Sequence, residues 1–306
     1  MFRAIFIALS ESRALRGIAE KSRIGRKMSG RFVAGMSVEE ALQASAATNQ
    51  RGMSVSVDNL GENVTNLDEA RHSAQLYHEM LDALTERKLN ANVSLKLTHM
   101  GLDVDEQVAR GIANDVVAHA ARLGNFVRID MEGSAYTQKT LDVVQELHRQ
   151  PGNANHVGAV IQAYLHRSEG DIHDLCDQRI RVRLCKGAYK EPAEIAFQDK
   201  ADVDANFVKL MKILLKSGVY HGIATHDPKM IDATIAFARA ENIPPSAFEF
   251  QMLYGVRRDL QDQLVRDGWG MRVYIPFGTE WYPYLMRRLA ERPANAIFIL
   301  KNVFRR

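Results

Sequence analysis

The stretch RVRLCKGAYK, residues 181–190, joins the pattern of a β-strand to an unusual choice of polar side chains. Val182 and Leu184 alternate with arginine and cysteine, and this period of two predicts a strand with one apolar face. The Lys-Gly pair that follows predicts a turn away from the strand. Arginine on the second face, just ahead of this turn, suits an anion or an electron-rich ring. A half-buried strand with solvated arginines also fits this stretch taken alone.

Seven other short runs follow the same plan, and helical segments separate most of them. The eight expected strands cover residues 52–58, 91–98, 125–132, 157–164, 180–186, 219–226, 247–253 and 271–276. Helical patterns cover residues 1–50, 67–88, 105–123, 138–150, 202–217 and 229–241, and Ser37 with Glu40 predicts a capping box. Strands alternating with helices in this number predict an α/β protein built as a (β/α)8 TIM-type barrel. An open doubly wound sheet is the alternative, but no G-x-G-x-x-G motif follows the first strand.

The two faces of these strands differ in chemistry. One face is apolar and in a barrel packs outward on the helices; it comprises Val55, Val57, Val93, Leu95, Leu97, Val127, Ile129, Met131, Val182, Leu184, Val273 and Ile275. The inward face carries, near the strand ends, Asp58, Lys96, Asp130, Gln162, Arg183, Gln251 and Tyr274. Deep barrel layers are normally apolar and unpaired buried charge is costly, so we expect this polar ring at the open mouth, where active sites form. The alternative is a salt-bridge network of Lys96, Asp130 and Arg183 that only fills the barrel.

The final helical segment carries a second polar group. Tyr284, Arg287, Arg288 and Glu291 fall at positions i, i+3, i+4 and i+7 and therefore share one stripe. Two adjacent arginines can hold a carboxylate from two directions through charge-assisted hydrogen bonds. This pattern favours a helix placed over the barrel mouth, although a solvated face with an Arg–Glu pair would look the same.

The composition excludes several classes of protein. A chain of 306 residues with 46% hydrophobic and 25% charged residues is globular and can bury a sizeable core. No apolar run approaches the roughly 20 residues of a membrane-spanning helix. Two cysteines, Cys176 and Cys185, cannot form a disulfide framework or a four-ligand zinc site, and they fit a reducing, cytoplasmic setting. The histidines show no H-E-x-x-H pairing, so no metal site is expected.

The positive charge is concentrated at the start of the chain. Residues 1–31 hold eight basic and two acidic side chains, a net charge of +6 in a chain whose total is +3. The remainder therefore lacks the basic density that nucleic-acid binding requires. The opening MFRAIFIALS is too short an apolar patch for a signal peptide. It suits either a helix packed on its own domain or an amphipathic helix touching an anionic membrane surface.

Seven motifs in order give the chain a family resemblance: SLKLT, RIDME, IQAYLHR, RVRLCKGAYKEP, IATHDP, FEFQMLYG and YIPFGTEWYPYLMRRLAERPAN. Together they resemble the proline dehydrogenases, a family of FAD-dependent barrels, from about residue 50 to the end. The chain is similar to the short, monofunctional bacterial members, without the aldehyde-dehydrogenase module of the bifunctional ones. The resemblance implies an N-terminal helical arm over residues 1–50 and an FAD-binding catalytic barrel over residues 51–306.

The resemblance also implies how the substrate is held. Arg287 and Arg288 would hold the carboxylate of L-proline, and Lys96 would be the basic residue beside the substrate with Asp130 as its charge partner. Asp130 and Arg183 are the expected catalytic residues. The residues that would pack over the ring are Tyr274, Tyr284 and Leu253.

For the cofactor FAD, the resemblance implies that Arg183 lies by the reactive ring nitrogen and that Gln162 reaches the pyrimidine edge. Glu291 would brace the two helix arginines and is grouped with the cofactor site. The other expected cofactor contacts are Met131, Cys185, Lys186, Gly187, Ala188, Tyr189, Thr225 and His226.

The implied reaction is oxidation of L-proline to Δ1-pyrroline-5-carboxylate by hydride transfer to FAD, the first step of proline catabolism. A membrane quinone would take the electrons, and a separate pyrroline-5-carboxylate dehydrogenase would take the product. The implied location is cytoplasmic, with peripheral contact at the inner face of the membrane.

Two other functions compete with this interpretation. Methylenetetrahydrofolate reductase is also an FAD barrel, but its long pterin-glutamate substrate needs a larger pocket than one closed by paired arginines. A non-catalytic membrane-surface protein with a basic arm would carry no flavin.

Overall fold

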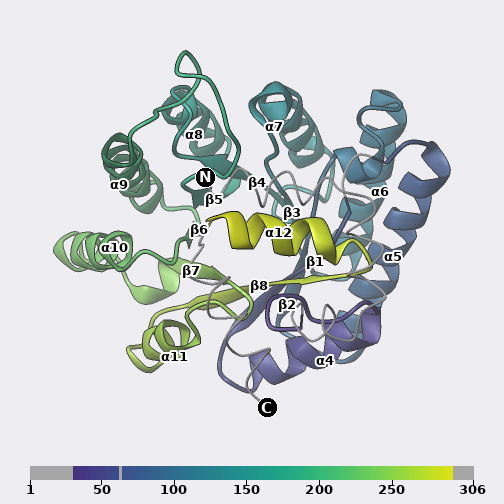
Figure 1. Cartoon of the computed structure of the whole chain (residues 1–306), viewed down its shortest axis with the longest axis horizontal. Helices are drawn as coiled ribbons and strands as arrows, with labels where there is room; N and C mark the ends of the chain where they lie inside the picture. Colours follow the sequence, from purple (N-terminus) through teal and green to yellow (C-terminus); the bar gives the residue numbers. More distant parts are fainter. Residues whose placement is uncertain (1–29, 62–63, 292–306) are drawn as a thin grey trace.

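The computed structural model describes residues 30–61 and 64–291, with side chains as far as Met286. Its centre is a closed barrel of parallel strands in chain order (Figure 1). The strands are β1 (Ser54–Asn59), β2 (Ala91–Leu95), β3 (Val127–Ile129), β4 (Val157–Gln162), β5 (Arg181–Cys185), β6 (His221–Ala224), β7 (Phe248–Leu253) and β8 (Met271–Phe277). Because β1 pairs in parallel with β8 as well as with β2, the predicted (β/α)8 barrel is confirmed and the open sheet is wrong.

Helices cover the outside of the barrel. They are α4 (Val38–Asn49), α5 (Leu67–Glu86), α6 (Glu106–Arg122), α7 (Ser134–Arg149), α8 (Ser168–Asp177), α9 (Lys200–Lys216), α10 (Pro228–Ala240), α11 (Arg258–Arg266) and α12 (Trp281–Glu291), with 3-10 turns η1 (Thr98–Met100) and η2 (Pro245–Ala247). The sequence pattern did not single out α8 and α11. These two helices have 10 and 9 residues, too few for several repeats of the helical period.

Helix α4 begins at the predicted capping box. The Ser37 hydroxyl accepts a hydrogen bond from the backbone N–H of Glu40, and the Glu40 carboxylate accepts one from the backbone N–H of Ser37. The helix packs against β1 and β8, and Ala41 and Leu42 are buried in the main core. Most of the predicted arm, residues 1–29, lies outside the described residues, so a boundary at residue 50 stays a prediction.

The outward faces of the strands form the core together with the helices. Val57, Leu95 and Ile129 are fully buried in one cluster with Leu81 of α5 and Val116 of α6. All the residues predicted to form the apolar face belong to this cluster. Burying such side chains contributes about 25 cal/mol per Å² of apolar surface, which makes this layer the main source of stability.

The barrel interior is more polar than we expected. We predicted polar residues only at the mouth, but Arg128, Glu249 and Arg272 lie deeper, on the inward face near the other strand ends. Charge can be kept there because Arg272 pairs with Glu249 at 2.6 Å and Arg128 donates to backbone carbonyls. Gly158 leaves the room this requires, since a Cβ atom there would lie 2.7 Å from Nη1 of Arg128.

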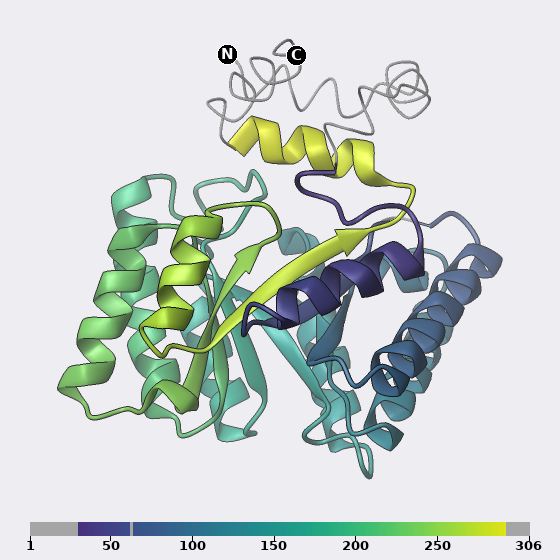
Figure 2. The same ribbon diagram turned by 90° about the horizontal axis from the view of Figure 1, so that it is seen from below.

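Helix α12 closes one end of the barrel. It crosses the opening in Figure 1 and lies above the C-terminal ends of the strands in Figure 2. Trp281, Tyr284 and Leu285 anchor its first turns in a second apolar cluster with Phe32 and Leu60. Within the described part of the chain, no helix is both long and apolar enough to cross a membrane.

Candidate active site

Two carboxylates and a lysine meet at the barrel mouth beneath α12. The ammonium of Lys96 lies 3.1 and 3.2 Å from the two oxygens of Asp58 and 3.9 Å from Asp130. We predicted Asp130 as the charge partner of Lys96, but in the structure Asp58 is the closer partner and Asp130 the more distant one. Strand register explains the difference, because β1 and β2 are direct neighbours and Asp58 pairs with Ser94, two residues before Lys96.

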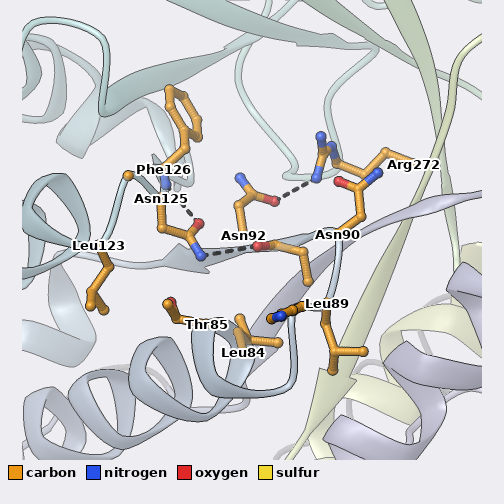
Figure 3. Close-up of a pocket in the computed structure, with 12 residues that line it drawn as sticks. Leu84, Thr85, Leu89, Asn90, Asn92, Leu123, Asn125, Phe126 and Arg272 are labelled. Carbon is orange, nitrogen blue, oxygen red and sulfur yellow. Dashed lines mark hydrogen bonds between the residues drawn. The ribbon is translucent and has the colours of Figure 1, made fainter.

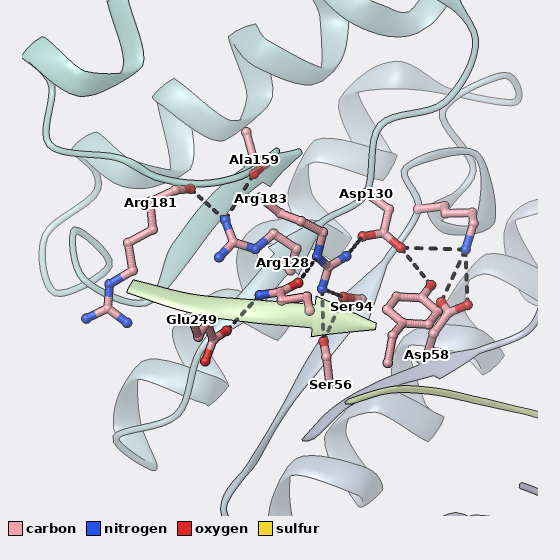
Figure 4. Close-up of polar contacts among 12 residues, drawn as sticks. Ser56, Asp58, Ser94, Arg128, Asp130, Ala159, Arg181, Arg183 and Glu249 are labelled. Atoms are coloured by element: carbon pink, nitrogen blue, oxygen red, sulfur yellow. Dashed lines mark hydrogen bonds and ion pairs between the residues drawn. The ribbon is translucent and has the colours of Figure 1, made fainter. Parts of the chain in front are cut away.

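Arg183 is buried at the centre of the same network (Figure 4). Its guanidinium donates to Asp130 at 2.6 Å and to the amide oxygen of Gln251 at 2.5 Å. Nη2 also donates to the hydroxyls of Ser56 and Ser94 at 3.2 and 3.0 Å. Four hydrogen bonds to side chains of three different strands and of the residue after β3 thus fix this cation rigidly.

Tyr274 connects the two carboxylates. Its hydroxyl donates to Asp130 at 2.8 Å, and Arg183 lies 5.1 Å from its ring centroid. Burial, followed by the charges of Asp130 and Asp58, raises the pKa of Tyr274 well above its usual value of 10. The phenol therefore stays protonated and acts as a hydrogen-bond donor.

Asp58 has the most perturbed carboxyl group of the mouth. Burial raises its pKa from 3.8 to about 6, with the Lys96 charge opposing this shift and the Asp130 charge adding to it. Tyr77 of α5 approaches from behind: its oxygen accepts a hydrogen bond from the backbone N–H of Asn59 at 3.3 Å, and its hydroxyl is hydrogen-bonded to Asp58. A carboxyl group that titrates near neutrality beside a lysine is typical of a functional site.

Two further residues, Glu132 just after β3 and Gln162 at the end of β4, are held by hydrogen bonds at the mouth. Buried Glu132 accepts hydrogen bonds from the Thr98 hydroxyl at 2.6 Å and from the Thr98 backbone at 3.3 Å. Its own backbone carbonyl accepts from the amide of Gln162 at 2.9 Å, which leaves the amide oxygen of Gln162 as an acceptor. These contacts tie the segment that follows Lys96 to β4.

The predicted cofactor residues from β5 and β6 lie along one side of the mouth. Lys186 is held by Asp204 at 2.5 Å and Asp227 at 2.7 Å, two carboxylates that the sequence pattern did not identify. His226 accepts a hydrogen bond from the backbone N–H of Leu253 at 2.9 Å, which joins a predicted cofactor residue to a predicted substrate residue. The other predicted positions on this side are Cys185, Ala188, Tyr189 and Thr225, whereas Met131 is buried just after β3.

This side of the mouth suits a flavin. Gly187 has a left-handed φ of 110°, and a Cβ atom there would lie 2.2 Å from the Tyr164 ring, so only glycine allows the loop after β5 to pack this closely on Tyr164. Tyr189 exposes 38% of its surface, an unusual fraction for an aromatic side chain. Together with the Arg183 cation and the Gln162 acceptor, the donor set fits the polar edge of an electron-rich ring system. Among the described residues, no cluster of His, Cys, Asp or Glu could hold a metal ion.

The predicted carboxylate clamp falls in the part of α12 whose side chains are not described. Arg287, Arg288 and Glu291 therefore lie outside the described side chains. Tyr284, on the same predicted stripe, is buried where α12 meets the barrel. The position of α12 over the mouth is consistent with the clamp without testing it.

Sequence reasoning missed several residues of this network. Asp58 was placed in the polar ring but given no role, and Tyr77, Glu132, Asp204 and Asp227 were not identified. Asp58 and Glu132 carried a usable signal, because each is a charged residue of inward parity at the end of an expected strand, 52–58 or 125–132. Tyr77, Asp204 and Asp227 come from helices or loops, where no strand periodicity marks them.

Comparison with known proteins identifies relatives along the whole chain. The family described as "Proline dehydrogenase" matches residues 41–301. Proline dehydrogenase 1 of Bacillus subtilis (strain 168) is 40% identical over 308 residues, covering 100% of both chains. The proline dehydrogenase of Deinococcus radiodurans is 41% identical and covers 90% of this chain and 89% of its own.

A solved structure has the same fold. Proline utilization A of Bdellovibrio bacteriovorus, inactivated by N-propargylglycine, superposes with a TM-score of 0.85 at 28% identity. The match covers 98% of this chain but only 37% of that one, so this chain spans about a third of that protein.

Proposed function

Since this chain belongs to the proline dehydrogenase family, and is thereby an enzyme that oxidises proline in proline catabolism, we propose that it does so by hydride transfer from L-proline to bound FAD. We further propose that a quinone receives the electrons and that the product is Δ1-pyrroline-5-carboxylate. The observation that supports this most strongly is the pairing of two cations, Lys96 and Arg183, with two carboxylates at the strand ends beneath α12.

FAD, when bound, supplies an acceptor for the hydride that leaves the carbon beside the proline nitrogen. Gln162, Lys186 and Gly187 would hold it along the β4 to β6 side of the mouth. Arg183 would place a fixed positive charge where negative charge develops on reduction. Its rigid attachment to Asp130 means that little reorganisation is needed at the moment of reaction.

The substrate would lie between Lys96 and α12. Arg287 and Arg288 would hold its carboxylate, with Glu291 bracing them, while Tyr274, Tyr284 and Leu253 pack against the ring. Holding a carboxylate from two directions aligns the neighbouring carbon, and a covering helix excludes water from the reacting atoms. A site closed by two paired arginines would suit proline better than a long pterin-glutamate substrate.

The test is an anaerobic titration of the purified, flavin-bound protein with L-proline. We expect the flavin absorbance to bleach in a saturable way and to return when a soluble quinone is added. Bleaching by dithionite but not by proline would overturn the proposal. A colourless protein that binds no added FAD would favour the non-catalytic alternative.

For location, we propose a cytoplasmic enzyme that visits the inner face of the membrane to reach its quinone, with a separate dehydrogenase consuming the product. The basic start of the chain motivates this, because anionic lipids attract clustered lysine and arginine. Deleting residues 1–10 should then reduce co-sedimentation with anionic vesicles, and unchanged co-sedimentation would count against it.

A further inference from the structure

The end of the barrel opposite α12 carries more positive than negative charge. Arg128, Arg181 and Arg272 gather near the N-terminal ends of the strands, and Glu249 is the carboxylate among them. Three cations against one anion leave a net charge of +2 for this group. Buried charge is costly unless it is paired, so this excess calls for an explanation.

Arg128 shows the imbalance most clearly. It is 5% exposed, and its Nη1 donates to the backbone oxygens of Ala159 at 3.0 Å and Arg181 at 2.6 Å. Its Nε is buried without a hydrogen-bond partner among the described residues. Burial lowers the pKa of Arg128 well below its usual value, and the neighbouring cations Arg183, Arg272 and Arg181 add to this against Glu249 alone.

Arg181 also lacks a carboxylate partner within the described part of the chain. Its guanidinium instead lies 5.3 Å from the ring centroid of Phe126 and 5.8 Å from that of Tyr220. Arg128 lies 4.8 Å from the same Phe126 ring. Phe126 therefore contacts both of these cations, and neither of them pairs with a carboxylate among the described residues.

Phe126 and Arg272 both line a hollow of about 460 Å³ at this end of the barrel (Figure 3). The hollow lies between the end of α5 and the starts of β2 and β3. Its polar lining includes Lys88, Asn90, Asn92 and Asn125, and its apolar lining includes Leu84, Leu89 and Leu123. Among the described residues, no carboxylate lines it.

The donors in this lining are arranged for an acceptor. The Asn92 oxygen accepts from Nη1 of Arg272 at 3.0 Å, which leaves the Asn92 amide group as a donor. Arg272 uses Nε for Glu249 and Nη1 for Asn92 and the Val55 carbonyl, while Nη2 makes no hydrogen bond with a described residue. Lys88 is exposed at the rim and forms no ion pair with a described carboxylate.

We propose that this hollow binds a small organic oxyanion, with its phosphate or carboxylate group on Lys88, Arg272 and Asn92 and its apolar part against Leu84 and Leu123. Such a ligand brings negative charge to Arg272, the member of the three-arginine group that lines the hollow. The mixed lining selects a molecule with both a charged head and an apolar body. The site lies at the end of the barrel away from the proline and flavin residues, so it stands independently of the proposed reaction.

Isothermal titration calorimetry of the full-length, flavin-bound protein tests this. The probes are phenyl phosphate, benzoate and inorganic phosphate. We expect phenyl phosphate to bind at one site per chain and more tightly than inorganic phosphate, which has no apolar part. Comparison with benzoate then identifies whether phosphate or carboxylate is the preferred head group.

Three variants locate the binding. Thr85→Trp fills the hollow from the exposed end of α5 and should abolish binding. Lys88→Asn keeps a residue suited to the left-handed φ of 53° and should weaken binding about tenfold, the loss expected for one charge-assisted hydrogen bond. Gln75→Trp adds the same bulk at an exposed position of α5 outside the hollow and should bind like the wild type.

Two results would overturn the site. One is the absence of saturable binding by both phenyl phosphate and benzoate. The other is equal affinity in Thr85→Trp and the wild type, which would place the anion at the other end of the barrel. Flavin content and proline oxidation, measured on each variant, establish that the protein is folded.

Discussion

Asp58 and Asp130 divide the cations of the barrel mouth between them. Asp58 takes Lys96, and Asp130 takes Arg183 and the Tyr274 hydroxyl. Because Asp58 has a pKa of about 6, the charge on this pair depends on pH. Above that pH the carboxylate is ionised and holds Lys96 in place; as the pH falls through about 6 the pair is lost.

Tyr77→Phe tests how Asp58 is kept ionised. The phenol donates to Asp58 in its charged form, so its removal should raise the pKa of Asp58 further. The KM for proline is expected to rise as the pH falls through about 6. In the variant this rise should occur at a higher pH, and kcat should change less. Steady-state kinetics across the acidic to weakly alkaline range measures both values.

Tyr220→Phe is the matched control. Tyr220 is likewise a mostly buried phenol bonded to a carboxylate, Glu249 at 2.9 Å, but it lies at the opposite end of the barrel. We expect a similar loss of stability and no change in the pH at which the KM rises. An equal shift in both variants, or in neither, would show that Tyr77 has no positioning role.

At the scale of elements, the loop between β5 and α9 shapes the side of the mouth where we propose that FAD binds. Glu191 in this loop accepts hydrogen bonds from the Ser134 backbone at 2.7 Å and the Ser134 hydroxyl at 2.6 Å. It thereby caps α7, whose own N-cap residue, Gly133, has no side chain. This distant cap explains why α7 begins at Ser134 rather than at residue 138 as predicted.

Glu191→Ala should release the loop that carries residues 186–189. A lost helix cap costs about 1–2 kcal/mol of stability. If the free energy of FAD binding falls by that amount, the affinity for FAD falls about tenfold. Fluorescence titration of the apoprotein with FAD measures this. Glu194→Ala, an exposed change in the same loop, should leave the affinity unchanged, and a parallel loss there would rule out the cap as the cause.

At the scale of the whole molecule, the barrel combines an apolar layer between strands and helices with a polar interior. The interior is crowded: Gly158 lies against Arg128, and Gly222 leaves room for the Gln251 side chain, whose amide nitrogen would be 2.3 Å from an added Cβ. Neither glycine needs a left-handed φ. They are required because arginine and glutamine side chains cross the barrel where other residues would project inward.

Gly158→Ala should therefore be strongly destabilising. The added Cβ would lie 2.4 Å from the backbone oxygen of Arg181, which cannot move without breaking the β5 ladder. We expect a loss of about 3 kcal/mol, the upper part of the range for overpacking. Urea unfolding midpoints measure the change.

Gly111→Ala is the opposite case. Gly111 is exposed in α6 and an added Cβ meets no atom within 4 Å. Alanine should stabilise this helix by about 0.5–1 kcal/mol. Equal effects of the two substitutions would contradict a tightly packed polar interior.

The sequence by itself determined that the chain forms a barrel and which side chains of each strand face inward or outward. Alternation in Val182–Leu184 and its counterparts separates the two faces because side chains on a strand point to opposite sides, whatever the neighbouring strands are. The same local rule predicted the capping box of Ser37 and Glu40. Both of these local predictions, the alternation of the strands and the capping box, were confirmed.

Only the tertiary structure decided which charged groups pair. Lys96 is bound to Asp58, 38 residues away, and α7 is capped by Glu191, 57 residues from its partner. Such choices depend on strand register and on which helix packs behind which strand. Ion pairs and hydrogen bonds act over a few ångströms in space, and a single sequence does not encode those distances in any local pattern.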